Sequence, residues 1–261
     1  MRKVILIALA AVFIACMSIY FYQKSDDFDM GLKGQAVSTA PDFRMMTDIS
    51  EKKHAFFSYL KPGIEFENAR ILKEREQLTL LQEAWFKGRL PAHAQSQIIQ
   101  LEEMYGVEWE EEQAEAWFNA MLHRVDVLPE ALVLTQAANE SAWGTSRFAR
   151  DANNYFGQWC YSQGCGLIPL ARSEGMSHEV AKFTSVQESI HRYFMNVNRN
   201  AAYHDLREIR FQLRQHDADL FSVDTALALS HGLLKYSERG EDYVNDLQAM
   251  MRHNQSYWQS E

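Results

Sequence analysis

An apolar run opens the chain, and after residue 46 apolar positions instead recur every three or four residues. The run covers residues 4–22 without a charge, and a helix needs about 20 such residues to cross a bilayer. Cleaved signal peptides have a shorter apolar core followed by small residues, a pattern that Ile14, Ala15 and Cys16 fit poorly. We therefore expect residues 1–22 to form a signal-anchor, with a cleaved signal peptide as the alternative.

The charges beside this run predict on which side of a membrane the rest of the chain lies. Arg2 and Lys3 precede the run, whereas Asp26, Asp27 and Asp29 follow it. Because positive residues tend to stay in the cytoplasm, we expect the rest of the chain in the periplasm. Residues 4–22 would then attach it to the inner membrane, and cleavage of the signal would instead release a secreted protein.

Two segments precede the part of the chain that carries candidate chemistry. Residues 23–46 show no sustained apolar period and include Gly31, Gly34 and Pro41, which predicts a linker. Residues 47–125 show helical spacing and contain no catalytic motif, so we expect a helical N-terminal region whose aromatic residues pack in a core. The helices predicted there are 52–60, 64–85, 92–105 and 110–124.

A helix that begins near Pro129 carries the first candidate catalytic residue. Proline is favoured in the first turn of a helix, and Gly144 ends the helical pattern. Glu140 lies near the C-terminal end, on the apolar stripe that includes Val133 and Ala137. Burial and the negative end of the helix dipole both disfavour an anion there. We therefore expect the raised pKa that a general acid needs, and an ordinary surface glutamate is the alternative.

Composition excludes several classes of protein. Of 261 residues, 47% are hydrophobic, and 26 Lys and Arg face 35 Asp and Glu, for a net charge of −9. This apolar content suffices for a folded core, whereas a nucleic-acid partner is not expected because binding phosphates requires a basic surface. We expect a substrate to be held by stacking and hydrogen bonds, with a weak dependence on salt.

No cofactor and no metal are expected. His178 and Glu179 are followed by Val180, Ala181 and Lys182, so the H-E-x-x-H pattern of zinc proteases is not completed. The chain also contains neither the phosphate-binding P-loop nor the G-x-S-x-G motif of serine hydrolases. Chemistry must therefore come from side chains placed by the fold.

Cys160 and Cys165 flank a loop of four residues. In an oxidising compartment we expect a disulfide that closes this loop and stiffens the segment. A weaker alternative is an amidase in which one of these cysteines acts with His178 or His191. That alternative requires a free thiol, so replacing the cysteines would abolish activity only in that case.

Four motifs follow one another between residues 129 and 250. They are QAANESAWGTS at 136–146, NNYFG at 153–157, KFTSVQESI at 182–190 and YSERGEDY at 236–243. Together they resemble the motifs of peptidoglycan glucosaminidases of the flagellar-muramidase type, with Asn139 where Leu is commoner. Upstream, AFFSYLKP at 55–62 and ENAR at 67–70 resemble the bacterial Bax proteins, in which a helical region precedes this domain.

The resemblance implies a fold and an activity. The fold would be mainly α, a lysozyme-like α+β catalytic domain over residues 126–255 with a small β-hairpin beside the substrate groove. The activity would be that of a glycoside hydrolase, an endo-β-N-acetylglucosaminidase acting on peptidoglycan glycan strands. Glu140 matches the family's catalytic acid, which protonates the leaving oxygen of the β-1,4 bond after N-acetylglucosamine.

A second carboxylate is expected at the hairpin, whose strands we predict at 167–172 and 180–183. Glu174 is the preferred residue, and Glu179 is the alternative acid and a candidate substrate contact. The substrate's own 2-acetamido group is a third candidate nucleophile. The separation of the two carboxyl groups would decide the stereochemistry of the reaction.

Aromatic residues of the same motifs complete the expected site. Tyr236 matches the family's functional tyrosine, and Tyr243 is a neighbour on the next helix that is expected to contact substrate or to support the fold. Asn154 is also expected to contact substrate. The candidates for stacking on sugar rings are Trp143, Phe156 and Trp159, with core packing as the alternative for the first two.

Two other functions are kept as alternatives. A lytic transglycosylase would use Glu140 as both acid and base, although such enzymes usually show GLMQ where this chain has YFGQ at 155–158. A wall-binding scaffold without turnover is the other, because Asn139 departs from the motif and the second acid is unsettled. The sequence identifies no protein partner.

Overall fold

The computed structural model describes residues 37, 39–170 and 178–258. The described residues belong to one compact unit. The predicted signal-anchor and most of the predicted linker lie outside the described residues. Within the described ranges, no helix has the length and apolar character needed to span a membrane.

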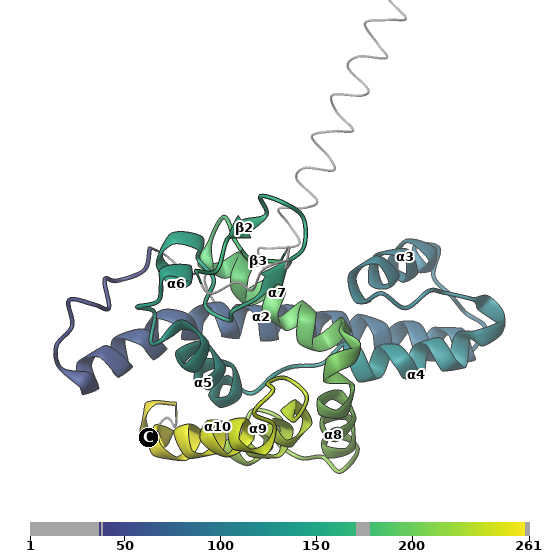
Figure 1. Cartoon of the computed structure of the whole chain (residues 1–261). Coiled ribbons are helices and arrows are strands. Elements are labelled where there is room, and N and C mark those ends of the chain that lie inside the picture. The colour runs from purple at the N-terminus through teal and green to yellow at the C-terminus, as the bar shows by residue number, and fades with distance from the viewer. Residues whose placement is uncertain (1–36, 38, 171–177, 259–261) are drawn as a thin grey trace, which may run out of the picture. The chain divides into compact units, whose positions relative to one another are not determined.

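Helices make up most of the described chain, and a small antiparallel sheet is set among them (Figure 1). The prediction of a mainly α protein with a small β element is therefore confirmed. The α-helices are α2 (Ile49–Phe86), α3 (Ala94–Tyr105), α4 (Ala114–Arg124), α5 (Glu130–Ser141), α6 (Arg147–Ala152), α7 (Val186–Arg199), α8 (His204–Gln215), α9 (Val223–Ser230) and α10 (Glu241–His253). The 3-10 turns are η1 (Glu111–Gln113), η2 (Ala201–Tyr203), η3 (His231–Leu233) and η4 (Gln255–Tyr257).

α2 is one long helix where the sequence pattern predicted two. Its N-terminus is capped by Asp48, whose side chain accepts a hydrogen bond of 2.7 Å from the backbone N–H of Glu51. The helix continues through Pro62 and Gly63, although proline removes one backbone hydrogen bond. A Cβ on Gly63 would lie 2.7 Å from Ile190 Cδ1 on α7. Gly63 therefore permits α7 to pack closely against α2. This packing compensates for the hydrogen bond lost at Pro62, so the helix continues.

α5 is the most enclosed helix near the candidate chemistry. It packs against α2 and also against α9 and α10, and it lies between these elements in Figure 1. All residues from Ala131 to Ala138 are buried, as expected for a helix surrounded by others. Asn139 and Glu140, in the last turn, reach the surface.

The sheet differs from the predicted two-stranded hairpin. Its strands are β1 (Trp159–Cys160), β2 (Gly166–Leu167) and β3 (Glu179–Ala181), in the order β1-β3-β2, and both pairs are antiparallel. Residues 171–172 of the first predicted strand lie outside the described residues. The sequence missed β1 because two residues are too short to show a strand period. A Cβ on Gly166 would clash with the Val180 carbonyl oxygen, so this tight pairing requires glycine.

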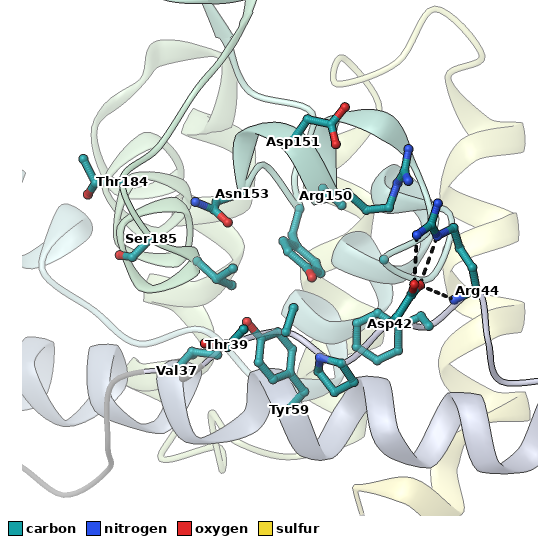
Figure 2. Close-up of a pocket in the computed structure, with 17 residues that line it drawn as sticks. Val37, Thr39, Asp42, Arg44, Tyr59, Arg150, Asp151, Asn153, Thr184 and Ser185 are labelled. Atoms are coloured by element: carbon teal, nitrogen blue, oxygen red, sulfur yellow. Dashed lines mark hydrogen bonds and ion pairs between the residues drawn. The ribbon is translucent and has the colours of Figure 1, made fainter.

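The described end of the predicted linker belongs to the core. Phe43 is only 1% exposed, and its ring lies 5.5 Å from that of Phe56 and 6.0 Å from that of Tyr59. Figure 2 shows this segment between α2 and the α6 region, where Asp42 and Arg44 form an ion pair of 2.8 Å beside a pocket of about 700 Å³. The segment is therefore fixed to the domain by residue 43.

The connection between α4 and α5 is held by buried polar groups. The Asp126 carboxylate is almost fully buried and pairs with Arg75 of α2 at 3.2 Å and with Arg214 of α8. Arg210 donates to the Asp126 backbone carbonyl at 2.9 Å. Asn68 of α2 exchanges two hydrogen bonds, of 2.9 and 3.0 Å, with the backbone of Leu128. The core is thus continuous across residues 125 and 126, and the domain boundary predicted there stays a prediction.

We predict that Asp126→Asn lowers the free energy of unfolding by about 3 kcal/mol or more, because it leaves Arg75 and Arg214 without a buried anion. Denaturant unfolding followed by circular dichroism measures the change. The matched control is Asp246→Asn, which removes an exposed pair with Arg239 and should cost less than about 1 kcal/mol. Equal effects of the two substitutions would contradict the assigned role of Asp126.

Candidate active site

Glu140 is placed by the way α5 ends. The chain leaves the helix through three residues with positive φ, which are Ala142, Trp143 and Gly144. The Ser141 hydroxyl accepts a hydrogen bond of 2.9 Å from the Gly144 N–H and fixes this turn. Glu140, in the preceding turn, is half-buried and opens onto a cleft of about 710 Å³. We call this space the Glu140 cleft.

The carboxylate of Glu140 has two hydrogen-bond donors and is largely shielded from water. The Tyr243 hydroxyl donates to Glu140 Oε1 at 3.1 Å, and Asn139 Nδ2 lies 3.3 Å from the same oxygen. Burial raises the pKa of Glu140 above its usual value, and these two hydrogen bonds oppose the rise without cancelling it. A raised pKa of Glu140 is what the sequence predicted.

A buried chain of hydrogen bonds directs the Tyr243 proton toward Glu140. Tyr193 donates to Oε1 of Gln136, and Gln136 Nε2 donates to the Tyr243 oxygen at 3.1 Å. Because Tyr243 accepts from Gln136, its own proton is left for Glu140. Sequence reasoning quoted Gln136 within a motif but missed this role. The available signal was a polar residue four positions before Glu140 on an otherwise apolar helix face.

Two further residues shape the space beside the carboxylate. The Tyr236 ring stacks on Tyr243 with centroids 5.2 Å apart, and its hydroxyl donates to the Phe156 carbonyl at 3.4 Å. Gly157 has a φ of +62°, and a Cβ there would lie 3.4 Å from Glu140 Oε2. The structure therefore brings Tyr236 to the cleft, and Gly157 leaves room beside Glu140 for a substrate.

Two exposed aromatic side chains line the Glu140 cleft. Trp159 is 54% exposed, and its ring stacks on His178 with centroids 4.0 Å apart. Tyr161, which sequence reasoning did not select, also lines the cleft and is 75% exposed. Phe156 is buried and stacks on Tyr193 at 4.2 Å, so its ring packs beneath the cleft. Of the three predicted stacking residues, Trp159 has the geometry for sugar contact.

Trp143 and Asn154 serve the fold in this structure. The Trp143 ring packs on Phe56 and Phe57 of α2, with centroids 5.6 and 5.3 Å apart, and does not line the Glu140 cleft. Asn154 is buried, and its Nδ2 donates to two backbone carbonyls, of Gln158 at 2.8 Å and of Ala181 at 2.9 Å. Trp143 thus packs against α2 and Asn154 supports the loop before β1, and the substrate contacts expected at these two positions stay predictions.

The two candidates for the second carboxylate have different outcomes. Glu174 lies outside the described residues. Glu179 is buried in β3, and its carboxylate accepts hydrogen bonds from the backbone N–H of Gly164 at 3.0 Å and of Gly166 at 2.8 Å. Glu179 therefore braces the loop beside the sheet and does not line the Glu140 cleft.

The structure contains the expected disulfide between Cys160 and Cys165. Their sulfurs and the Glu179 carboxylate lie within 4.8 Å of one another, a spacing that metal ligands share. Because each sulfur is bonded to the other, neither is the thiolate that binds a metal or attacks a substrate. The amidase alternative therefore has no available nucleophile at these positions.

Comparison with known proteins decides the family. The model of the glucosaminidase family, described as mannosyl-glycoprotein endo-beta-N-acetylglucosaminidase, matches residues 115–256, which is more than half of the chain. The chain belongs to the glucosaminidase family. Protein bax of Escherichia coli (strain K12) is 35% identical to it over 218 residues, 84% of this chain and 75% of the relative. No solved structure matches the chain significantly.

The position of Glu140 at the domain's cleft yields a prediction on stability. Its pKa is raised in the folded state, so ionisation is less favourable there than in the unfolded chain. We predict that Glu140→Gln raises the melting temperature at neutral pH. This gain should shrink as the pH falls to about 4, the usual pKa range of glutamate, because the native residue then also becomes neutral.

The matched control for this prediction is Glu238→Gln, which makes the same change of charge at an exposed position. Its melting temperature should follow that of the native protein over the whole pH range. A Glu140→Gln variant that is less stable than the native protein at neutral pH would show that the carboxylate is not disfavoured by its surroundings.

Proposed function

We propose that this protein is a peptidoglycan hydrolase, an endo-β-N-acetylglucosaminidase that cleaves the β-1,4 bond after N-acetylglucosamine with Glu140 as the general acid. The observation that carries the proposal is a half-buried glutamate with a raised pKa, facing a cleft in a chain of the glucosaminidase family. An exposed tryptophan that lines the cleft, Trp159, supports a sugar substrate, because pyranose rings offer apolar faces to aromatic rings.

The proposed first step follows from the contacts of Glu140. Protonated Glu140 gives its proton to the departing glycosidic oxygen as the bond to the sugar breaks, and it becomes a carboxylate. The Tyr243 hydroxyl, 3.1 Å from Oε1, then stabilises the new charge. Gln136 keeps that hydroxyl in the donating orientation.

The group that completes the reaction is also a proposal. Among the described residues that line the Glu140 cleft, Glu140 is the one carboxylate. We therefore keep Glu174 as the proposed second acid, with the 2-acetamido group of the substrate as the alternative. We place the enzyme in the periplasm, attached through residues 4–22, where peptidoglycan is its partner.

A lytic transglycosylase is the second candidate function. A single carboxylate in the described part of the cleft is the arrangement that this reaction needs, because one residue then acts first as acid and later as base. The two reactions differ in their products. Hydrolysis leaves a reducing N-acetylglucosamine end, whereas the transglycosylase reaction leaves an anhydro-muramic acid end.

We predict that purified full-length protein releases fragments ending in reducible N-acetylglucosamine from peptidoglycan. The Glu140→Gln variant should cleave about a hundredfold to ten-thousandfold more slowly than the native protein, because it lacks the general acid. Mass analysis of products reduced with borohydride measures both results. Anhydro ends would assign the protein to the transglycosylases, and binding without cleavage by native protein and variant alike would favour a scaffold.

We predict a shift in pH dependence for Tyr243→Phe. The Tyr243 hydroxyl favours the charged form of Glu140, so its removal should raise the pKa of that carboxyl further. Because Glu140 must be protonated to act, the basic limb of the kcat/KM profile should move to higher pH, while the maximum rate falls. Tyr257→Phe removes a hydroxyl bonded to Ser50 outside the cleft and should leave the profile in place.

A further inference from the structure

A second cleft borders the Glu140 cleft at β1, whose Trp159 lines both. Its volume is about 800 Å³, and it shares four lining residues with the Glu140 cleft. These shared residues are Gln158, Trp159, Asn196 and Asn200. A glycan strand that lies against Trp159 would therefore bring the groups attached to its sugars to this second cleft.

Four cationic side chains line the second cleft, and we call it the basic cleft. They are Arg124 at the end of α4, Lys182 after β3, and Arg192 and Arg199 on α7. Glu188 is the one carboxylate among the described lining residues. This concentration of positive charge contrasts with the chain's net charge of −9.

The cations of the basic cleft are only partly neutralised: hydrogen bonds from Thr184 and, more weakly, the charge of Arg192 lower the pKa of the neighbouring Glu188. Among the described residues, no carboxylate oxygen lies within 4.0 Å of the charged nitrogens of Lys182, Arg192 or Arg199. The carboxylate of Glu188 accepts hydrogen bonds from Thr184, at 2.8 Å from its N–H and 2.6 Å from its hydroxyl. The side chains of Lys182, Arg192 and Arg199 are exposed and can form new ion pairs.

Two guanidinium groups of the basic cleft, those of Arg124 and Arg199, repel each other. Arg124 donates to the carbonyls of Tyr105 at 2.6 Å and of Gly106 at 3.1 Å. Burial, followed by the positive charge of Arg199, lowers the pKa of Arg124. A Cβ on Gly106 would lie 3.0 Å from Arg199 Nη2, so glycine lets this guanidinium lie against the backbone. An anion bound here would relieve the repulsion.

We propose that the basic cleft binds the carboxylates of the peptide arms that peptidoglycan carries on its muramic acid sugars. The inference rests on the proposed function and names a further part of the same substrate. Guanidinium groups form paired, charge-assisted hydrogen bonds with carboxylates, and a polymer held at Trp159 carries such carboxylates beside its sugar rings. Arg124 and Gly106 belong to the helical N-terminal region, which thereby contributes one wall of the substrate site.

Binding to soluble peptidoglycan fragments tests this inference with full-length Glu140→Gln protein, which prevents turnover. The fragments are used with their peptide carboxylates intact and after conversion of these groups to amides. Calorimetry should give at least about tenfold weaker binding for the amidated fragments. Salt should weaken binding of the intact fragments and have little effect on the amidated ones.

Charge reversal identifies the residues responsible. Arg192→Glu with Arg199→Glu, in the Glu140→Gln background, should weaken binding of intact fragments about tenfold and leave binding of amidated fragments unchanged. Arg192→Lys with Arg199→Lys keeps the charge and should restore most of the affinity. The matched control, Arg89→Glu, changes an exposed cation after α2 outside both clefts and should have no effect.

The outcomes separate this inference from the proposed function. Equal binding of intact and amidated fragments, or an equal loss for both in the charge-reversed protein, would overturn the inference. Glycan strands from which an amidase has removed the peptides gain a free carboxylate on each muramic acid. They should bind like the amidated fragments, and binding as tight as that of intact fragments would show that the basic cleft does not select peptide carboxylates and would overturn the inference. Absence of cleavage by the native protein would overturn only the proposed function. Melting curves check that each variant folds.

Discussion

The enclosure of α5 by other helices is the constraint on which the candidate site depends. A helix surrounded by α2, α9 and α10 has its polar side chains removed from water, and each such group needs a partner. Gln136 finds its partners in Tyr193 and Tyr243. The same enclosure partly desolvates Glu140 at the end of the helix. Burial of one helix thus accounts for both the raised pKa of Glu140 and the orientation of the Tyr243 hydroxyl that donates to it.

The helical N-terminal region takes part in this arrangement through buried polar contacts. Asn68 and Arg75 of α2 bond to Leu128 and Asp126, immediately before α5 begins. A shift of α2 would therefore move the start of α5, and with it Glu140. The region without motifs is in this way part of the scaffold of the catalytic domain.

The sequence selected groups whose chemistry follows from residue type and spacing, but it did not reveal which polar side chains bond to the backbone. Glu140 could be selected because its helix stripe and motif coincide, and the cysteine pair because its loop is short. Asn154 and Glu179 looked equally suited to a substrate, but their oxygens accept hydrogen bonds from nearby N–H groups. Whether a polar side chain bonds to the backbone of a loop depends on the path of that backbone, which residue spacing does not predict.

Total charge does not reveal how charges are distributed over the fold. A net charge of −9 predicted little electrostatic attraction, and the fold gathers cations from α4, α7 and the segment after β3 in one cleft. Their separation from Glu140 matters, because a nearby cation would lower the pKa of the acid and oppose its protonation. No cation contributes to the shifted pKa of Glu140, and Arg239 in its cleft pairs with Asp246. Under the proposed function, one substrate would meet a protonated acid in one cleft and a cationic surface in the adjacent cleft, two groups that oppose each other when they lie close together.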